Sequence, residues 1–342
     1  MRPRPTVADV ARTAGVSRTT VSHALSGKGR VDARTRERVQ AVADRMGYVP
    51  SRTARNLALS RSDTIGLLLP QLARLPMDEL LRTDWYGRVS LAASQEAVRH
   101  QRALTILPPI QDAAELMSFG LDGVIVLDPL PEDPRWDALQ GSTSPVVLLG
   151  RDPHGTLGPS VVPDTDQGMQ ALLDHLWEQG VRSLGLIAPD IAWAEGQQAI
   201  RAAASWCEAK GITPMVARAQ VSQCVTREAA AAAGRATAQD VLASANRPDA
   251  LVGLLEDFGR GIVSAARSRG LSVPGDLLVA QDVDGLLAQV ADPPITAIDL
   301  NIAGQITAAV TLLVADDEDR VASSTVQTVS VNLVVRDSTL AR

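Results

Sequence analysis

The segment S-R-T-T-V-S-H at 17–23 concentrates polar side chains that can exchange hydrogen bonds with nucleic-acid bases. Arg18 and Thr19 lie at the start of an expected helix, and Ser22 and His23 follow one turn later on the same exposed face. Guanidinium, hydroxyl and imidazole groups supply donors and acceptors, and the first turns of a helix can present them to base edges in the major groove. The chemistry that this segment predicts is recognition of DNA.

Three short helices are expected to position this face. Thr6 and Asp9 form a capping-box pair at the start of the first helix, and Gly15 ends it. Ser17 then caps the second helix and Asp32 caps the third. Apolar residues at helical spacing would form their common core: Val7, Val10, Ala11, Ala14, Val21, Ala24, Leu25, Val39, Val42 and Met46. A plain helical hairpin with a solvated polar face shares part of this pattern, but the third helix favours a closed DNA-binding unit.

The charge distribution supports the same interpretation. Residues 1–60 carry twelve basic and four acidic side chains, a net charge of +8, whereas the remaining chain carries 21 basic and 35 acidic side chains, a net charge of −14. A basic module displaces counterions from phosphates, while an acidic body is repelled by them. We therefore expect the first 60 residues to bind DNA and the body to face away from it.

The rest of the chain alternates short apolar runs with helical stretches. Examples are I-G-L-L-L-P at 65–70, G-V-I-V-L at 123–127 and L-G-L-I-A at 184–188. Such alternation predicts parallel sheets covered by helices on both faces, and the number of runs favours two sheets over one. The expected fold class is α/β, with a small all-α unit in front of it.

The N-terminal motifs resemble the headpiece and hinge of the lactose-repressor family of bacterial transcription regulators. They are T-V-A-D-V-A, A-G-V-S-R-T-T-V-S, V-D-A-R-T-R-E-R-V and G-Y-V-P-S-R-T-A-R-N-L-A, all within 6–58. The resemblance implies base contacts by Arg18, Thr19 and His23, and a hinge that folds in the minor groove with Leu57 wedged into a base step. His23 departs from the arginine of many relatives. The implied DNA contacts are Thr6, Ser17, Arg18, Thr19, Ser22, His23, Arg30, Arg52, Ala54, Arg55 and Leu57.

The body resembles the periplasmic-binding-protein-like core of the same family, in which two doubly wound subdomains enclose a ligand cleft. The supporting motifs are V-P-D-T-D-Q-G at 162–168, G-L-S-V-P-G-D at 270–276 and L-V-V-R-D-S-T near the C-terminus. The implied organisation is a DNA-binding domain at 1–48, a hinge at 49–61 and a core at 62–342, with an N-subdomain at 62–161 and 289–321 and a C-subdomain at 162–288 and 322–342.

The cleft departs from the polar set that the family resemblance implies. Gly150, Ala199, Leu255 and Val283 stand where relatives commonly carry aspartate, arginine, asparagine and aspartate. A buried hydroxyl without a partner costs roughly 1 to 3 kcal/mol, so a typical sugar is a poor match, although a carbohydrate stays one candidate effector. Residues near strand ends that could line the cleft instead, Trp193 foremost, are Trp85, Tyr86, Arg151, Asp152, Trp193, Arg201, Glu256, Asp282 and Asp284.

Several other chemistries lack the residues that they need. The four histidines are scattered and the two cysteines lack metal-ligand spacing, so we expect no metal and no cofactor. The G-L-S-V stretch at 270–273 runs into proline where a nucleophile elbow needs glycine, and we expect no enzyme. No apolar run reaches 18 residues and no signal peptide is apparent, which predicts a cytoplasmic, nucleoid-associated protein without a membrane partner.

These observations predict a homodimeric, sequence-specific transcription regulator, preferably a repressor. Its partners would be double-stranded DNA with a pseudo-palindromic operator and a small-molecule effector in the core cleft. Two alternatives stay open. The protein could be a regulator that has lost ligand sensing, or, in a different class, a solute-binding receptor with the same core fold.

Overall fold

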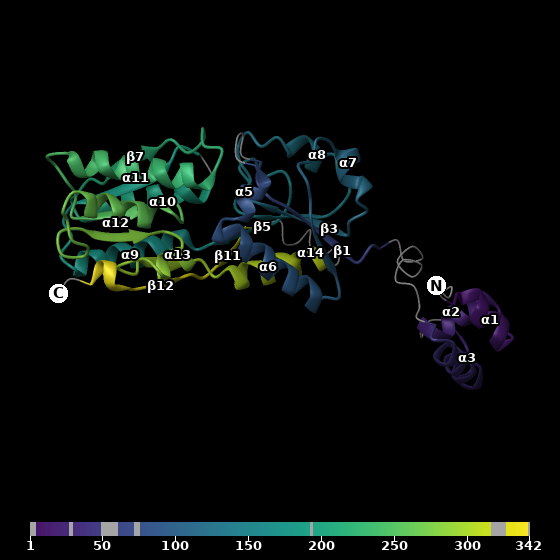
Figure 1. Ribbon diagram of the computed structural model, residues 1–342. Helices are drawn as coiled ribbons and strands as arrows, with labels where there is room; N and C mark the ends of the chain where they lie inside the picture. Colours follow the sequence, from purple (N-terminus) through teal and green to yellow (C-terminus); the bar gives the residue numbers. More distant parts are fainter. Residues whose placement is uncertain are drawn as a thin grey trace. The chain divides into compact units, whose positions relative to one another are not determined.

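The computed structural model describes residues 5–26, 30–48, 61–71, 76–191, 194–315 and 326–340. Contacts divide the chain into two units, Met1–Ser62 and Asp63–Arg342, which are described separately. In the described ranges, no helix is both long and apolar enough to cross a membrane. Figure 1 labels the helices of both units and several of the strands.

Three helices form the first unit, and local hydrogen bonds fix where they begin and end. They are α1 (Val7–Ala14), α2 (Arg18–Ser26) and α3 (Ala33–Met46). The Thr6 backbone N–H donates to Asp9 Oδ2 at 3.0 Å, and the Asp9 N–H donates to Thr6 Oγ1 at 3.3 Å. Gly15 ends α1 with φ of 67°, and Ser17 Oγ accepts a 3.1 Å bond from the Thr20 N–H at the start of α2. The predicted helix-turn-helix with a third helix is confirmed.

The core of this unit is small and drawn from all three helices. Val10, Val21 and Val39 are fully buried at its centre, and Val42 is nearly so. Around them pack the half-buried side chains of Val7, Val16, Leu25, Val31, Met46 and Tyr48. The predicted apolar positions therefore face inward, which leaves the polar side of α2 exposed.

The first sheet of the second unit is entirely parallel. Its order is β11-β5-β4-β3-β1-β2 among the described residues. The strands are β1 (Thr64–Leu68), β2 (Ala103–Ile106), β3 (Gly123–Leu127), β4 (Val146–Leu149), β5 (Ser160–Pro163) and β11 (Val326–Val329). The helices beside it are α5 (Met77–Leu81), α6 (Asp84–Arg99), α7 (Ala113–Ser118), α8 (Trp136–Gln140) and α14 (Ile302–Val314).

Both faces of this sheet are buried, as the continuous apolar runs predicted. Successive strand residues point to opposite faces. Ile65 and Leu67 of β1 join the hydrophobic cluster beneath α6 and α14, while Leu68 joins the cluster beneath α7 and α8. This alternation explains why the runs show no polar positions.

The second sheet has the order β12-β10-β9-β8-β6-β7 in the described part of the chain. Its strands are β6 (Leu184–Pro189), β7 (Met215–Ala219), β8 (Ala250–Gly253), β9 (Leu278–Gln281), β10 (Thr296–Asp299) and β12 (Asn332–Val334). Ile187 of β6 packs toward α11 (Arg227–Ala243) and α12 (Phe258–Ser268), whereas Leu186 packs toward α9 (Thr165–Glu178) and α10 (Ala194–Ala209). The short α13 (Leu286–Gln289) and a 3-10 turn at Asp337–Thr339 complete this half. One edge differs from the expected parallel sheet, because β12 pairs with β10 in the antiparallel direction.

The connections between the two halves fall later than the expected boundaries at 288 and 321. β10 pairs with β9, so the chain stays in the second half until residues 300–301, where it leads into α14. β11 pairs with β5 of the first sheet, so the last connection lies at 330–331. Strand pairing decides these positions, and for β11 and β5 it joins segments more than 150 residues apart in sequence, which local apolar pattern does not encode.

Candidate DNA-binding face and ligand cleft

One side of α2 presents the predicted base-contacting residues to solvent. Arg18, Thr19, Ser22 and His23 are all exposed, while Val21 and Ala24 on the opposite side are buried. The hydroxyls of Thr6 and Ser17 are exposed as well, but they already serve as caps of α1 and α2. Arg30 is exposed just before α3. The structure thus separates a small inward apolar side from a continuous outward polar side, the geometry that base readout requires.

Five of the predicted site residues lie outside the described residues. They are Arg52, Ala54, Arg55 and Leu57 of the expected hinge, and Trp193 of the expected cleft.

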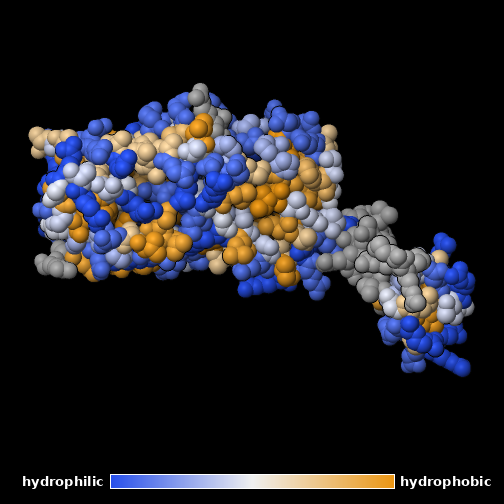
Figure 2. All heavy atoms as spheres, in the orientation of Figure 1, coloured by the Kyte–Doolittle hydropathy of each residue, from blue (hydrophilic) through white to orange (hydrophobic). Residues whose placement is uncertain are grey.

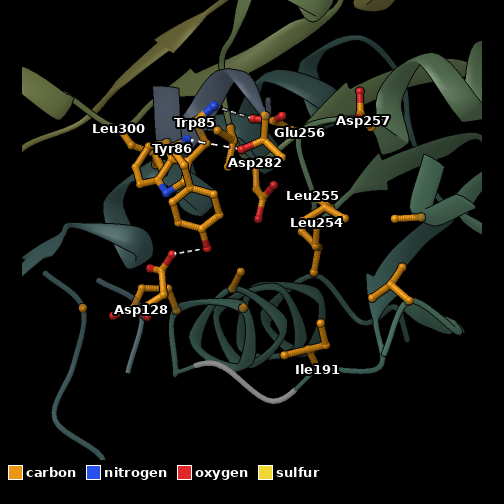
Figure 3. Close-up of a pocket in the computed structure, with 18 of the residues that line it drawn as sticks. Trp85, Tyr86, Asp128, Ile191, Leu254, Leu255, Glu256, Asp257, Asp282 and Leu300 are labelled. Carbon is orange, nitrogen blue, oxygen red and sulfur yellow. Dashed lines mark hydrogen bonds between the residues drawn. The ribbon is translucent and has the colours of Figure 1, made fainter. Parts of the chain in front are cut away.

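A cavity of about 380 Å³ lies between the two sheets of the second unit. Its walls come mostly from the carboxyl ends of strands and the loops that follow them, which is where open α/β sheets place ligands. Asp128 follows β3, Asp190 follows β6, Glu256 follows β8 and Asp282 follows β9. The close-up in Figure 3 shows acidic and aromatic side chains around this space.

The structure brings four of the predicted cleft residues together and leaves four others outside. Trp85, Tyr86, Glu256 and Asp282 line the cavity, as do the four positions where the resemblance implies lost polar groups: Gly150, Ala199, Leu255 and Val283.

The side chains of Arg151, Asp152, Arg201 and Asp284 are absent from the described lining, which corrects those predictions. Arg201 points away on the exposed side of α10 and donates to Gln198 Oε1 at 2.7 Å. Asp284 receives two 2.8 Å bonds from the Arg336 guanidinium, and Asp152 accepts backbone N–H groups of its own loop. Arg151 is exposed.

Sequence reasoning missed Asp128 and Glu195. The Tyr86 hydroxyl donates a 2.7 Å hydrogen bond to Asp128 Oδ2, and Asp128 adopts a positive φ of 41° directly after β3. Burial raises the pKa of Asp128, and it raises the pKa of Glu195 to about 7, with the nearby Asp128 charge adding to the effect. Asp128 could have been predicted as a cleft residue, because it directly follows a predicted strand. The sequence does not indicate, however, which strand ends lie around the same cavity.

Two further carboxyl groups complete an acidic lining. Burial raises the pKa of Glu256 and of Asp282 to about 7 in each case. Basic character is scarce: in the described lining, Arg227 is the only arginine or lysine, and its guanidinium is held by Asp257 at 2.8 and 3.0 Å. In the described residues, no group of three or more histidine, cysteine or acidic side chains could hold a metal ion.

The same acidic side chains connect the two halves of the unit. Glu256 accepts the backbone N–H groups of Asp84 and Trp85 at 3.0 and 2.7 Å, which places a carboxylate at the N-terminus of α6. Glu195 of α10 accepts the Arg151 N–H at 2.8 Å from the other half. Glu256 and Glu195 therefore line the cavity and also connect the two halves that form its walls.

Known proteins match both parts of this chain. Residues 6–51 match the lacI family of bacterial regulatory proteins, and residues 173–339 match the periplasmic binding protein-like domain. Catabolite control protein A of Staphylococcus xylosus is 24% identical over 303 residues, which span 86% of each chain, and the Priestia megaterium protein of that name matches to the same extent.

Solved structures agree with these matches. The lac repressor dimer bound to operator and the anti-inducer ONPF has a TM-score of 0.80 at 22% identity, with 99% of this chain and 100% of that chain covered. The transcriptional regulator CelR in complex with cellobiose has a TM-score of 0.67 at 24% identity, with 98% of this chain and 100% of that chain covered. The chain therefore carries a lacI family DNA-binding domain at residues 6–51, followed by a periplasmic binding protein-like domain at residues 173–339, and it is similar over most of its length to regulators that combine these two parts.

Proposed function

We propose that this protein is a dimeric transcription repressor that binds a pseudo-palindromic operator, with an affinity that a small ligand in the core cleft adjusts. The observation that carries the proposal is the outward face of α2, where Arg18, Thr19, Ser22 and His23 are exposed on a helix fixed by a packed core. The proposed organisation is the headpiece 1–48, the hinge 49–61 and the core 62–342. We assign the protein no enzymatic activity and place it in the cytoplasm with the nucleoid.

Arg18→Ala is expected to weaken operator binding by about 10- to 100-fold, because a good arginine contact to a base is worth about 1 to 3 kcal/mol. The variant should keep its fold, since the Arg18 side chain is exposed and absent from the headpiece core. Fluorescence anisotropy with the operator and with a scrambled duplex of equal length measures the effect.

Arg45→Ala provides the matched control, because Arg45 is exposed in the last turn of α3, where its Nε bonds the Ala41 carbonyl. It removes the same charge without touching α2. The proposal predicts that only Arg18→Ala lowers the ratio of specific to nonspecific affinity. Equal losses in both variants, with that ratio unchanged, would contradict base readout by α2.

An exposed apolar strip on the second unit fits the proposed dimer. Leu91 and Val98 of α6 are 60% and 68% exposed, and Leu286 and Val290 at α13 are 57% and 66% exposed. The two helices adjoin, because Asp84 Oδ2 accepts the Leu286 N–H at 3.0 Å and Arg88 donates to the Asp284 carbonyl at 2.7 Å. Figure 2 shows apolar surface over both elements. Such a strip favours burial against a second copy.

The double variant Leu91→Asp with Leu286→Asp is expected to convert the dimer to a monomer, since it places unpaired charges in the proposed interface. Analytical ultracentrifugation measures the change in mass. Val216→Asp is the control, because Val216 is exposed on β7, the opposite edge of the second sheet from β12. A double variant that sediments as a dimer would contradict this interface.

Ligand control would act by linkage. A ligand that prefers one spacing of the two halves shifts that equilibrium, and it changes operator affinity only to the extent of this preference. The contacts of Glu256 and Glu195 across the cavity give the halves a defined arrangement for a ligand to stabilise or disrupt. A regulator without ligand sensing is the second candidate, favoured by the apolar lining at Gly150, Ala199, Leu255 and Val283.

A further inference from the structure

We propose that the effector is an organic cation, an amine or guanidine joined to an apolar body, held by four carboxyl groups in the cleft. This inference rests on the proposed function, because it names the ligand class of the regulatory cavity. The four groups are Asp128, Glu195, Glu256 and Asp282, and all of them line the same space of about 380 Å³. A cavity of this size suits a small organic molecule.

The four carboxyl groups approach the cavity from both halves of the unit. Asp128 belongs to the first half, and the other three belong to the second half. In Figure 3, Asp128 lies on one side of the open space, and Glu256 and Asp282 lie together on another side. A cation placed between them would be attracted by both walls, so it would favour an arrangement that keeps the two halves close together.

Asp282 most directly points to a missing partner. Its Oδ1 atom is fully buried and has no hydrogen-bond partner among the described residues. Figure 3 shows its carboxyl group directed into the cavity. A carboxylate with an unpaired buried oxygen is costly, and a charged donor that reaches this group from the cavity would reduce that cost.

Side chains in the described lining do not supply this donor. Arg227 donates to both Asp257 oxygens and to the Arg82 carbonyl, the latter at 3.2 Å. The Tyr86 hydroxyl donates to Asp128, and the Ser222 hydroxyl donates to Asp190. The hydrogen-bonding capacity left over is therefore mostly that of acceptors. An anionic ligand such as a phosphate or carboxylate would be repelled, whereas a cation with several N–H donors would be satisfied.

The remaining lining is apolar, which indicates that the part of the ligand away from its charged group is apolar as well. Met169, Ile191, Leu254 and Leu255 line the cavity together with the indole of Trp85. Aliphatic or aromatic carbon would be buried against these side chains, and an ammonium group could lie over the Trp85 ring. A neutral sugar fits less well, because Gly150, Ala199, Leu255 and Val283 offer no polar side-chain atoms to its hydroxyls.

Burial of the carboxyl groups gives cation binding a characteristic pH dependence. The pKa values of Glu195, Glu256 and Asp282 lie at about 7. The other ionisable side chains that line the cavity in the described residues are Asp128, Asp190, Asp257, Arg227, Tyr86 and Cys224. Raising the pH from 6 to 8 ionises the carboxyl groups while an alkylamine stays protonated, so its affinity should rise by about tenfold. A neutral ligand would not gain in this way.

The test is isothermal titration calorimetry of the full chain with two amines and their neutral counterparts. The probes are 1,5-diaminopentane against 1,5-pentanediol and 2-phenylethylamine against 2-phenylethanol, with cellobiose as a neutral sugar, each at about pH 6 and about pH 8. We expect at least one amine to bind, more tightly at the higher pH, and its neutral counterpart not to bind. Asp282→Asn should reduce that affinity by about tenfold or more, whereas the control Glu208→Gln, on the exposed side of α10, should not.

Failure of both amines to bind at concentrations up to about 10 mM would overturn the proposal, as would binding that Asp282→Asn leaves unchanged or binding of cellobiose alone. Operator titration of the same preparation separates this inference from the proposed function. Operator binding without amine binding would mean that the proposed ligand class is wrong and that the proposed function as a transcription regulator is unaffected. Amine binding without operator binding means that the cleft site stands and the DNA-binding function fails.

Discussion

Asp133→Asn is expected to lower the free energy of unfolding of the core by about 3 to 5 kcal/mol, because it removes the charged partner of a fully buried arginine. Arg135 is 0% exposed, and its Nε donates to Asp133 Oδ1 at 2.8 Å. Burial alone would raise the pKa of Asp133, but the hydrogen bonds and charge of Arg135 hold this pKa below its ordinary value. The variant would leave an uncompensated guanidinium in the interior.

Arg135 also connects this pair to the cleft. It donates to the backbone carbonyls of Leu68 and Leu69 at the end of β1, at 3.2 and 2.8 Å, and to that of Leu127 at the end of β3, at 3.1 Å. Leu127 precedes Asp128, so the arginine holds the strand end that positions one of the cleft carboxyl groups. Loss of Asp133 should therefore disturb the cavity as well as the stability of the core.

Denaturant unfolding of the full chain measures this effect, followed by a signal from the core. Asp292→Asn is the matched control, because Asp292 forms an ion pair with Arg267 in which the two side chains are 90% and 67% exposed. An exposed pair of this kind contributes at most about 1 kcal/mol. Losses of equal size in the two variants would show that the buried pair has no special role.

The core is also expected to lose stability as the pH rises from about 5 to about 8. Glu195, Glu256 and Asp282 have folded pKa values of about 7, against ordinary values of 4.5, 4.5 and 3.8. At pH values between the ordinary and the folded pKa values, the folded chain binds more protons than the unfolded chain. The free energy of unfolding therefore falls as the pH rises through this interval. Each group can account for roughly 3 kcal/mol across this window, and the loss ends above the folded pKa.

Carboxyl groups with lowered pKa values affect the stability of the core in a lower pH range. Asp133, Asp152, Asp190 and Asp249 are stabilised in their charged form, so their contribution is lost only as the pH falls below about 4. Calorimetric melting of the ligand-free chain between pH 5 and pH 8.5 therefore reports the cleft groups together with His175, whose pKa burial lowers from 6.5 and which acts in the opposite direction. The difference between a cleft variant and the unmodified chain separates the two contributions. Glu256→Gln should flatten the profile, and Glu208→Gln should preserve it. A melting temperature that rises steadily with pH would exclude the raised pKa values.

The sequence predicted the headpiece in detail because local contacts determine it. Thr6 and Asp9, or Asp32 and Thr35, are three residues apart, and their caps form whatever the rest of the chain does. Strands that are buried apolar runs, such as β1, β3 and β6, were predicted from the sequence. β11 was not, because its residues are largely exposed and it joins the first sheet only through pairing with β5.

The cleft was predicted only in part, for a similar reason. Strand ends indicated Glu256 and Asp282, but Asp284, two residues further, turns toward Arg336, which lies 52 residues away in sequence. Glu195 enters the cavity from the start of α10, where no strand-end pattern marks it. Which side chains converge on the cavity depends on the spacing of the two sheets, and that spacing is a property of the folded core.

The proposed function requires that this chain recognise a specific duplex through α2. The most direct test is selection of the purified full chain against a random duplex library at about 150 mM salt, with and without cell extract to supply a ligand, in parallel with Arg18→Ala. We expect the unmodified chain to enrich a pseudo-palindromic site and the variant to lose this enrichment. Weak, salt-driven binding to all duplexes, with no sequence enriched in either condition, would contradict it.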